Sequence, residues 1–236
     1  MPARILFITG TDTGVGKTTV AAGLAAALTA RGETVGVLKP AETGCEAAEG
    51  QLLASDARRL AFFSGCGAEA QTICPYRFRE PLAPSVAAER AGQRIDLSVI
   101  RAACERLRAA HSVVLVEGAG GLLVPLVDRV TFADVCAELD APLVIVVANK
   151  LGAVNHAALT MRCAERDGLR LAGYVINTIT PQPDLAAETN VSVLTKLFGP
   201  PLGVIPWLGD VRETPADRAR LARIFREHLA LDRLQG

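Results

Sequence analysis

The chain has 236 residues, 50% of them hydrophobic, and its 25 basic residues balance 25 acidic ones. This length is typical of one large α/β domain, which by size scaling buries roughly 70–75% of the surface of its unfolded chain. We therefore expect a single domain over residues 1–236 that folds without a disulfide or a structural metal. A net charge of zero argues against nucleic acid or an anionic membrane as the main partner. Basic pairs such as Arg58-Arg59 are interpreted as solvated helix faces.

The cysteines and the apolar runs bear on where the protein works. The six cysteines include no Cys-x-x-Cys pair, and the three histidines do not cluster with them, so no zinc or redox motif is visible. No apolar run approaches the roughly 18 residues that a membrane-spanning helix needs. The first residues lead into an apolar strand pattern and not into a secretory signal. We expect a cytoplasmic protein with reduced thiols.

Short β-branched apolar runs alternate with longer segments of helical periodicity. The expected strands are 4–9, 35–38, 113–116, 143–147, 173–176 and 202–205. The expected helices are 17–31, 53–63, 97–110, 132–139, 153–168, 184–198 and 215–230. Continuous apolar strands in this alternation predict a doubly wound α/β fold, with a mostly parallel sheet, helices on both faces, and ligands at the carboxyl ends of the strands. We expect the irregular segment 65–95 to be a loop that lines or covers a site, and residues 231–236 to fray.

The most informative segment is Gly10–Thr18, which reads Gly-Thr-Asp-Thr-Gly-Val-Gly-Lys-Thr. An apolar strand, a glycine-rich loop and a helix that opens with Lys-Thr form the setting of a phosphate loop. The helix N-terminus favours an anion, and glycines let the loop amides approach phosphate oxygens. Lys17, expected to be exposed in this loop, would reach the β- and γ-phosphates, and the Thr18 hydroxyl would hold Mg²⁺. The sequence therefore predicts a nucleoside triphosphate site.

The loop departs from the common pattern in one respect, and it also lacks the defining residue of a related group of ATPases. Its first glycine, Gly10, stands one residue early, so that five residues separate it from Gly16. Partition and nitrogenase-type ATPases place a second lysine five residues before the loop lysine, where this chain has Asp12.

Two strands end in charged residues that we expect at the same edge as the loop. Glu117 follows the strand 113–116 and precedes Gly118-Ala119-Gly120-Gly121; it is either an ordinary exposed acid or the carboxylate beside a phosphate loop that helps to hold Mg²⁺. Lys39 ends the strand 35–38; it is either a surface lysine or a cation that neutralises a phosphoryl group or an anionic substrate. Asp56 opens a helix, either as a first-turn acid or as a second carboxylate for Mg²⁺.

Further candidates follow the last two strands. Asn177 ends one of them, and an amide can read adenine with its donor and its acceptor together. Pro206-Trp207-Leu208 follows the other strand, although a lone tryptophan more often packs than binds a base. No Ser/His/Asp or Cys/His arrangement is visible, so we expect no covalent protein intermediate.

With these motifs in this order, the chain resembles the dethiobiotin synthetase family over about residues 4 to 213. The most specific elements are the loop 10–18, Lys39-Pro40 with Thr43 four residues after the lysine, and Val116-Glu117-Gly118-Ala119-Gly120-Gly121. The resemblance implies an enzyme that makes the ureido ring of dethiobiotin from 7,8-diaminononanoate, CO₂ and MgATP. It also implies a carbamate, a carbamic–phosphoric anhydride and ring closure by the second amine.

The resemblance also assigns roles to residues of this chain. The groups around the carbamate and the phosphoryl group would be Thr13, Lys17, Lys39, Thr43 and Gly120. Those around ATP would be Gly14, Val15, Gly16, Lys17, Thr18, Thr19, Asp56, Glu117, Gly118, Ala119, Gly120, Asn177, Thr178, Pro206, Trp207, Leu208 and Glu213. The ligands of Mg²⁺ would be Thr18, Asp56 and Glu117. The resemblance further implies a homodimer in which Asn155 of the neighbouring subunit contacts the carboxylate tail of the substrate.

Two other classes of protein share parts of this pattern. Cobyrinate amide synthetases have a similar ATP domain but need a glutaminase domain, which we do not expect within these 236 residues. Partition and septum-positioning ATPases use nucleotide as a dimerisation switch on DNA or membrane. Asp12 and the zero net charge speak against this second class.

Overall fold

A parallel sheet forms the centre of the computed structural model, which describes residues 3–48 and 50–234. Six strands lie in the order β12-β11-β10-β1-β7-β2. Their bounds are Arg4–Gly10 (β1), Val35–Leu38 (β2), Val113–Gly121 (β7), Leu143–Ala148 (β10), Leu171–Asn177 (β11) and Gly203–Ile205 (β12). Every neighbouring pair in this sheet is parallel. The expected strands and their parallel arrangement are therefore confirmed.

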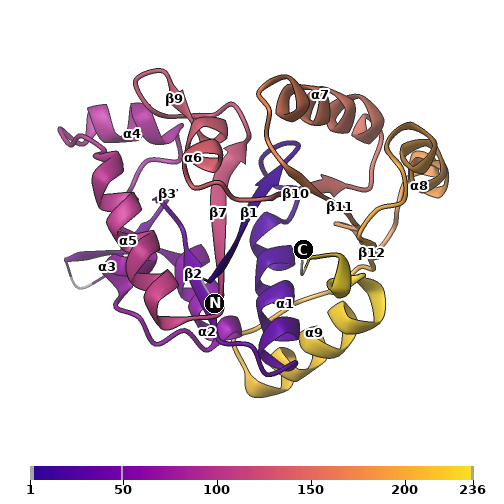
Figure 1. Cartoon of the computed structure of the whole chain (residues 1–236), viewed down its shortest axis with the longest axis horizontal. Coiled ribbons are helices and arrows are strands. Elements are labelled where there is room, and N and C mark those ends of the chain that lie inside the picture. Colours follow the sequence, from indigo (N-terminus) through magenta and orange to yellow (C-terminus); the bar gives the residue numbers. More distant parts are fainter. Residues whose placement is uncertain (1–2, 49, 235–236) are drawn as a thin grey trace.

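Helices cover both faces of this sheet, as expected for a doubly wound fold. In Figure 1, α6 and α7 lie on one side of the sheet, and α1 and α9 lie on the other. The helices that the sequence predicts are Lys17–Thr29 (α1), Ser55–Ser64 (α2), Leu97–Ala110 (α5), Phe132–Glu138 (α6), Ala153–Arg166 (α7), Leu185–Phe198 (α8) and Pro215–His228 (α9). Each agrees with the sequence prediction to within two residues at either end.

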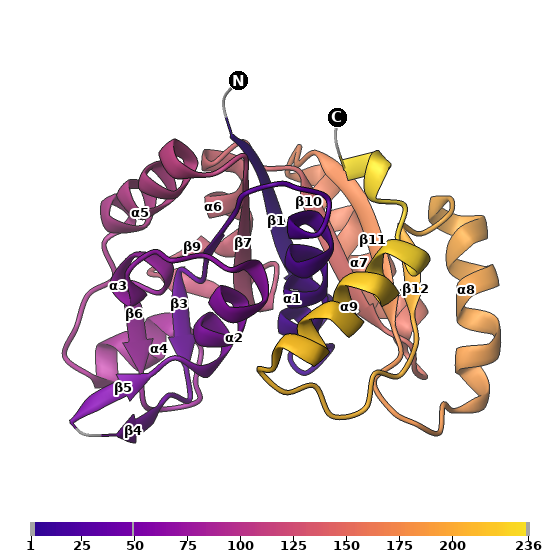
Figure 2. The same ribbon diagram turned by 90° about the horizontal axis from the view of Figure 1, so that it is seen from below.

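Several short elements were not predicted. They are β3 (Ala41–Thr43), β4 (Glu46–Ala48), β5 (Gln51–Leu53), α3 (Ala70–Ile73), β6 (Tyr76–Phe78), α4 (Pro84–Arg90), β8 (Pro125–Val127), β9 (Val130–Thr131) and the 3₁₀ helix η1 (Leu231–Leu234). The expectation of an irregular 65–95 segment was wrong, because α3, β6 and α4 lie within it. Figure 2 shows β3 beside β6, with the β4–β5 hairpin at the periphery. Elements this short depend on tertiary partners and leave no periodic signal.

The C-terminal residues also differ from the expectation. Residues 231–234 form η1, and the side chains of Leu231 and Leu234 are buried in the core. The prediction that residues 231–236 fray is wrong for this part of the segment, while residues 235 and 236 lie outside the described residues. Burial of two leucines stabilises a turn that the composition alone does not indicate.

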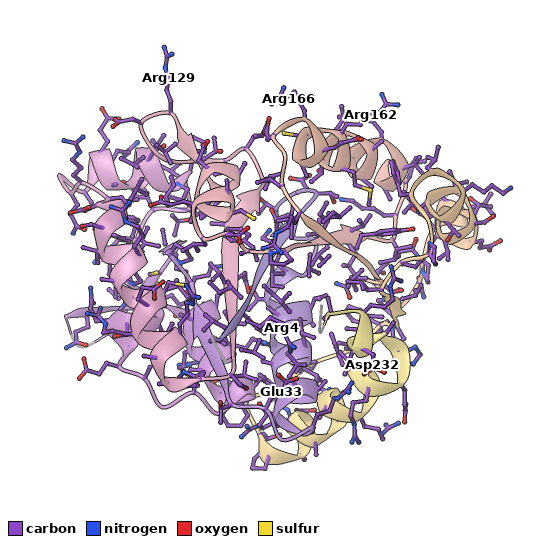
Figure 3. All side chains as sticks on the ribbon, viewed as in Figure 1. Arg4, Glu33, Arg129, Arg162, Arg166 and Asp232 are labelled. Atoms are coloured by element: carbon purple, nitrogen blue, oxygen red, sulfur yellow. The ribbon has the colours of Figure 1, made fainter. Side chains whose placement is uncertain are left out.

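Helix α1 anchors the loop that precedes it. Its residues from Val20 to Leu28 are all buried, which is typical of a helix enclosed by protein on every side. Gly23 lets α1 approach α9 closely, since a Cβ there would lie 2.1 Å from the Phe225 ring. At the amino edge of the sheet, Arg4 pairs with Glu33 at 2.9 Å (Figure 3). Because α1 is buried along its length, its first residues are held in place at the opposite, carboxyl edge of the sheet, where β1 ends.

Candidate active site

The loop between β1 and α1 has a backbone that its glycines make possible. Gly14 and Gly16 have φ values of 75° and 87°, which lie in the left-handed region that glycine adopts readily. Gly16 is also the N-cap of α1, and no side chain caps the helix there. The first amides of α1 are thus free of a side-chain acceptor and face the position where an anion is favoured.

Asn177 supports this loop from the end of β11. Its side-chain amide is buried and donates a hydrogen bond from Nδ2 to the Val15 carbonyl oxygen at 3.0 Å. A Cβ on Gly16 would lie 2.2 Å from the same nitrogen. The predicted base-reading residue therefore also fixes the shape of the phosphate loop.

Lys17 is buried, which corrects the expectation of an exposed loop lysine. Its side chain curls back into the loop, and Nζ donates to the Asp12 carbonyl oxygen at 3.0 Å. Only 8% of the residue is exposed. Burial, together with the charge of Lys39, lowers the pKa of Lys17 to about 8. The Lys17 ammonium is therefore enclosed by the loop, with Lys39 as a second cation near it.

A second lysine joins a cluster of two carboxylates beside this loop. The Lys39 ammonium pairs with Glu117 and with Asp56 Oδ2, the latter at 3.2 Å. Thr18 Oγ1 donates to Glu117 Oε1 at 2.8 Å. Burial opposes the charge on Lys39, but the carboxylates of Glu117 and Asp56 outweigh it and raise the pKa of Lys39 above its usual range. Lys39 and Glu117 are buried. For each of them, the alternative in which it is an ordinary surface residue was therefore wrong.

The donor set of this cluster fits Mg²⁺. Glu117 Oε2 is buried and has no hydrogen-bond partner within the described residues, so one lone pair of a carboxylate remains available. The Thr18 hydroxyl and the Asp56 carboxylate lie on the same cavity. Mg²⁺ favours oxygen ligands and is commonly held by one or two carboxylates together with phosphates and water. Thr18, Asp56 and Glu117 would supply this set.

These groups surround a cavity of ≈ 370 Å³ at the carboxyl edge of the sheet. Its lining residues are Thr13, Gly14, Gly16, Lys17, Thr18, Thr19, Lys39, Glu42, Thr43, Asp56, Glu117, Ala119 and Gly120. A second cavity of ≈ 210 Å³ is lined by Gly14, Gly16, Thr19, Arg59, Asn177, Thr178, Ile179, Trp207, Leu208, Gly209 and Val211. The two share residues of the phosphate loop, so the structure places the predicted phosphate and base regions next to each other.

Arg59 differs from its sequence interpretation, while Trp207 lines the second cavity. Trp207 is 46% exposed, so it is not a packed core residue. Arg59 lines the second cavity and donates from Nη2 to the Val211 carbonyl oxygen at 2.8 Å. It is only partly exposed and is not a solvated charge on a helix face. No local pattern distinguishes it from the neighbouring Arg58.

Several predicted residues do not line either cavity. Val15 is buried in the core, and the Gly118 carbonyl oxygen accepts a hydrogen bond from Lys39 Nζ at 3.4 Å. Glu213 pairs with Arg58 at 3.2 Å. Pro206 lies next to Trp207, outside the cavity lining. Asn155 is exposed on α7, which this single chain does not bring to the cavities.

Glu42 is a site residue to which the sequence analysis gave no role. Its carboxylate is buried and accepts hydrogen bonds from the Asp56 and Ala57 amides, both at 2.9 Å, and from Ser55 Oγ at 3.3 Å. It thus caps α2 from β3, because Ala54, the N-cap residue in the chain, makes no side-chain bond. Sequence rules for caps look within three residues of the helix start, so this partner could not be found by them.

Comparisons with known proteins place this chain in a family. A family model described as an AAA domain matches residues 4–214. The ATP-dependent dethiobiotin synthetase of Anaeromyxobacter dehalogenans strain 2CP-C is 45% identical over 92% of this chain and 94% of its own length. The chain belongs to the family of ATP-dependent dethiobiotin synthetases. An Escherichia coli K12 member is 39% identical over 89% of this chain and 93% of its own length. The family resemblance drawn from the sequence is therefore confirmed.

Solved structures show the same fold in more distant proteins. A putative plasmid partition protein of Borrelia burgdorferi B31, bound to AMPPNP, has a TM-score of 0.57 and 14% identity, covering 96% of this chain and 99% of its own. A MinC:MinD cell division complex of Aquifex aeolicus gives 0.56 and 16%, covering 94% and 88%. At this identity the likeness shows the fold alone.

None of the helices within residues 3–48 and 50–234 has both the length and the apolar composition of a membrane-spanning helix.

Proposed function

We propose that this dethiobiotin synthetase family member uses ATP to carboxylate 7,8-diaminononanoate with CO₂ and to close the ureido ring. The observation that carries the proposal is the placement of Lys17 and Lys39 on one cavity with Thr18, Asp56 and Glu117. Two ammonium groups beside an Mg²⁺ donor set suit a reaction in which several anionic oxygens meet. ADP, phosphate and dethiobiotin would be the products.

The proposed reaction has three steps. The amine at carbon 7 adds to CO₂ and loses a proton, which gives a carbamate. A carbamate oxygen then attacks the γ-phosphorus of ATP, the bond to the ADP oxygen breaks, and a carbamic–phosphoric anhydride forms. The second amine attacks the carbamate carbon, the bond to the phosphate oxygen breaks, and the amine loses its proton as the ring closes.

The residues of this chain act in these steps by position and charge. Lys17 and Lys39 would neutralise the carbamate and the transferring phosphoryl group, and the hydroxyls of Thr13 and Thr43 and the backbone of Gly120 would orient them. All five line the cavity. Because the substrate amine is itself the nucleophile, no protein nucleophile is needed. Mg²⁺, held by Thr18, Asp56 and Glu117, would offset charge on the β- and γ-phosphates.

The nucleotide would extend from the phosphate loop into the second cavity. The loop residues Gly14 to Thr19 and the glycine turn after Glu117 would hold the phosphates. The remaining base and ribose contacts are proposed for Asn177, Thr178, Pro206, Trp207, Leu208 and Glu213. The adjacency of the two cavities and the half-exposed Trp207 ring support this direction.

We also propose that the chain is a single cytoplasmic domain that works as a homodimer, with small-molecule partners and neither nucleic acid nor membrane. One continuous hydrophobic core supports the single domain. Leu159 on α7 and Leu151, two residues before this helix, are 62% and 78% exposed. Exposed leucines close to Asn155 fit a subunit contact. The dimer would bring Asn155 of the partner subunit to the carboxylate tail of the substrate.

One assay tests the proposed reaction. ADP release is followed with the diamine alone, with bicarbonate alone and with both, and the product is identified by mass spectrometry. The proposal expects ADP release and a dethiobiotin mass only when both are present. ATP hydrolysis that responds to DNA or lipid vesicles but is indifferent to the diamine would contradict it and would favour a nucleotide-dependent switch.

A further inference from the structure

Glu42 connects two parts of the site that are separate in the chain. It lies on β3, whose ladder with β6 pairs Ala41 with Tyr76 and Thr43 with Phe78. Its side chain reaches the first turn of α2, 13 to 15 residues later. The intervening β4–β5 hairpin is largely exposed and lies at the periphery (Figure 2). The Glu42 carboxylate therefore links the β3–β6 ladder to the start of α2 by hydrogen bonds.

Both oxygens of this carboxylate are already used by the helix. Oε1 accepts from the Asp56 amide and from Ser55 Oγ, and Oε2 accepts from the Ala57 amide. The first amides of a helix are unpaired donors at the positive end of its dipole, where a carboxylate is favoured. Although Glu42 is on the cavity wall, its oxygens are turned toward α2. This arrangement suits the placement of a helix better than proton transfer to a substrate.

The residue placed by this cap is Asp56. Its amide hydrogen bonds to Glu42, and its carboxylate oxygen Oδ2 lies 3.2 Å from Lys39 Nζ. Glu42 thus holds the backbone of Asp56 and Lys39 holds its side chain. Lys39 and Glu42 are three positions apart in the chain. Because α2 carries Asp56 in its first turn, any shift of the helix start moves the carboxylate relative to Glu117.

We propose that Glu42 is a positioning residue, which sets the Asp56 carboxylate in the cation site by capping α2. This inference rests on the proposed role of Asp56 as a ligand of Mg²⁺. Groups that orient a metal ligand change metal affinity by about 10- to 100-fold when they are lost. Removal of Glu42 therefore weakens divalent-cation binding even though Glu42 itself does not contact the ion.

The test measures Mn²⁺ binding by electron paramagnetic resonance to protein saturated with a non-hydrolysable ATP analogue, with Mn²⁺ in place of Mg²⁺. Glu42→Asp keeps the charge but withdraws the oxygens by one methylene, and Glu42→Gln keeps the reach but removes the charge. We expect Glu42→Ala and Glu42→Asp to weaken Mn²⁺ binding by about tenfold or more, and Glu42→Gln to be intermediate. In steady-state assays with Glu42→Asp, the Mg²⁺ concentration for half-maximal rate should rise while kcat at saturating Mg²⁺ is largely regained.

Asp96→Ala is the matched control. Asp96 is the N-cap of α5 and accepts from the Ser98 amide at 2.8 Å, so its loss removes a carboxylate cap elsewhere. Asp96→Ala should leave Mn²⁺ binding within twofold of the unmodified protein. If circular dichroism shows that Glu42→Ala does not fold, the other two variants carry the test. The inference then expects Glu42→Asp to bind Mn²⁺ more weakly than Glu42→Gln does.

Two results would overturn the inference, and they are distinguishable. If Glu42→Asp binds Mn²⁺ as tightly as the unmodified protein while Asp56→Asn and Glu117→Gln bind it weakly, Glu42 does not position the ligand and the proposed metal site stands. If Asp56→Asn and Glu117→Gln also leave Mn²⁺ binding unchanged, the metal assignment itself fails, and the role of Glu42 fails with it.

Discussion

Lys39 and Glu117 form a buried ion pair across the neighbouring strands β2 and β7. The parallel register pairs Leu38 with Val116, so the next residue of each strand meets the other at the carboxyl edge. Both residues are at most 3% exposed, and Asp56 adds a second carboxylate to the same ammonium. Lys39 and Glu117 therefore depend on each other for charge compensation, whereas the Asp56 side chain is 41% exposed to solvent.

The first prediction concerns the loss of that ammonium. Lys39→Met keeps most of the side-chain volume but removes the ammonium that pairs with the buried Glu117 carboxylate, and breaking a buried pair typically costs about 3–5 kcal/mol of unfolding free energy. We expect a loss of this size in urea unfolding with EDTA present. Lys39→Met/Glu117→Gln should recover part of it, because the uncompensated charge is gone. A double variant less stable than Lys39→Met alone would show that the buried charge is not the cause.

The second prediction uses the lowered pKa of Lys17. At pH 8, a pKa of about 8 leaves the free site about half protonated. Phosphate oxygens beside the ammonium favour its charged form, so binding of a non-hydrolysable ATP analogue should take up about half a proton per site. Lys39, whose pKa is raised, is protonated throughout and contributes nothing.

Calorimetry at pH 8 in buffers of different ionisation enthalpy measures this uptake. The signal should fade toward pH 6, where Lys17 is already protonated in the free site. Lys17→Arg is the control, since a guanidinium stays charged. Equal uptake by Lys17→Arg and the unmodified protein would assign the proton to another group.

Much of the fold and part of the site were accessible from the sequence for a physical reason. Strands buried on both faces, such as Leu143–Ala148, leave continuous apolar runs, and a parallel sheet brings all of their carboxyl ends to one edge. That rule alone places Lys39 and Glu117 beside the phosphate loop. The family resemblance then supplied the expected roles.

The remainder depends on contacts that are distant in the chain. β3 pairs with β6 across some 35 residues, Ala41 opposite Tyr76, and each strand is only three residues long. The capping of α2 by Glu42 depends on this pairing. The burial of Lys17 follows from the path of the loop around Asp12, which a glycine-rich sequence permits but does not specify.

The third prediction tests the close approach of α1 and α9. Gly23→Ala gains helix propensity worth about 1 kcal/mol, but its Cβ would lie 2.1 Å from the Phe225 ring. Overpacking of a core typically costs about 1–3 kcal/mol, so we expect a net loss of thermal stability. The double variant Gly23→Ala/Phe225→Leu should lose less stability than the two single variants lose together, because the smaller side chain at position 225 makes room for the added methyl group. Strict additivity would place the cost of Gly23→Ala elsewhere.

The fourth prediction separates two glycines of the phosphate loop. Gly14 and Gly16 both have positive φ, but an added Cβ meets no atom within 4 Å at Gly14 and meets Asn177 Nδ2 at 2.2 Å at Gly16. The backbone strain of alanine, about 1–2 kcal/mol, is therefore shared by both variants, and the collision with Asn177 belongs to Gly16→Ala alone. In urea unfolding without nucleotide, the unfolding free energy of Gly16→Ala should be lower than that of Gly14→Ala by about 1–3 kcal/mol.

Asn177→Ala identifies the source of that difference. It removes the Nδ2 bond to the Val15 carbonyl oxygen, so it should lower stability on its own. In the Asn177→Ala background, however, Gly16→Ala should cost no more than Gly14→Ala, because only the shared strain remains. If the extra cost of Gly16→Ala persists without the Asn177 side chain, the constraint on the loop lies in its own backbone and not in the support from β11.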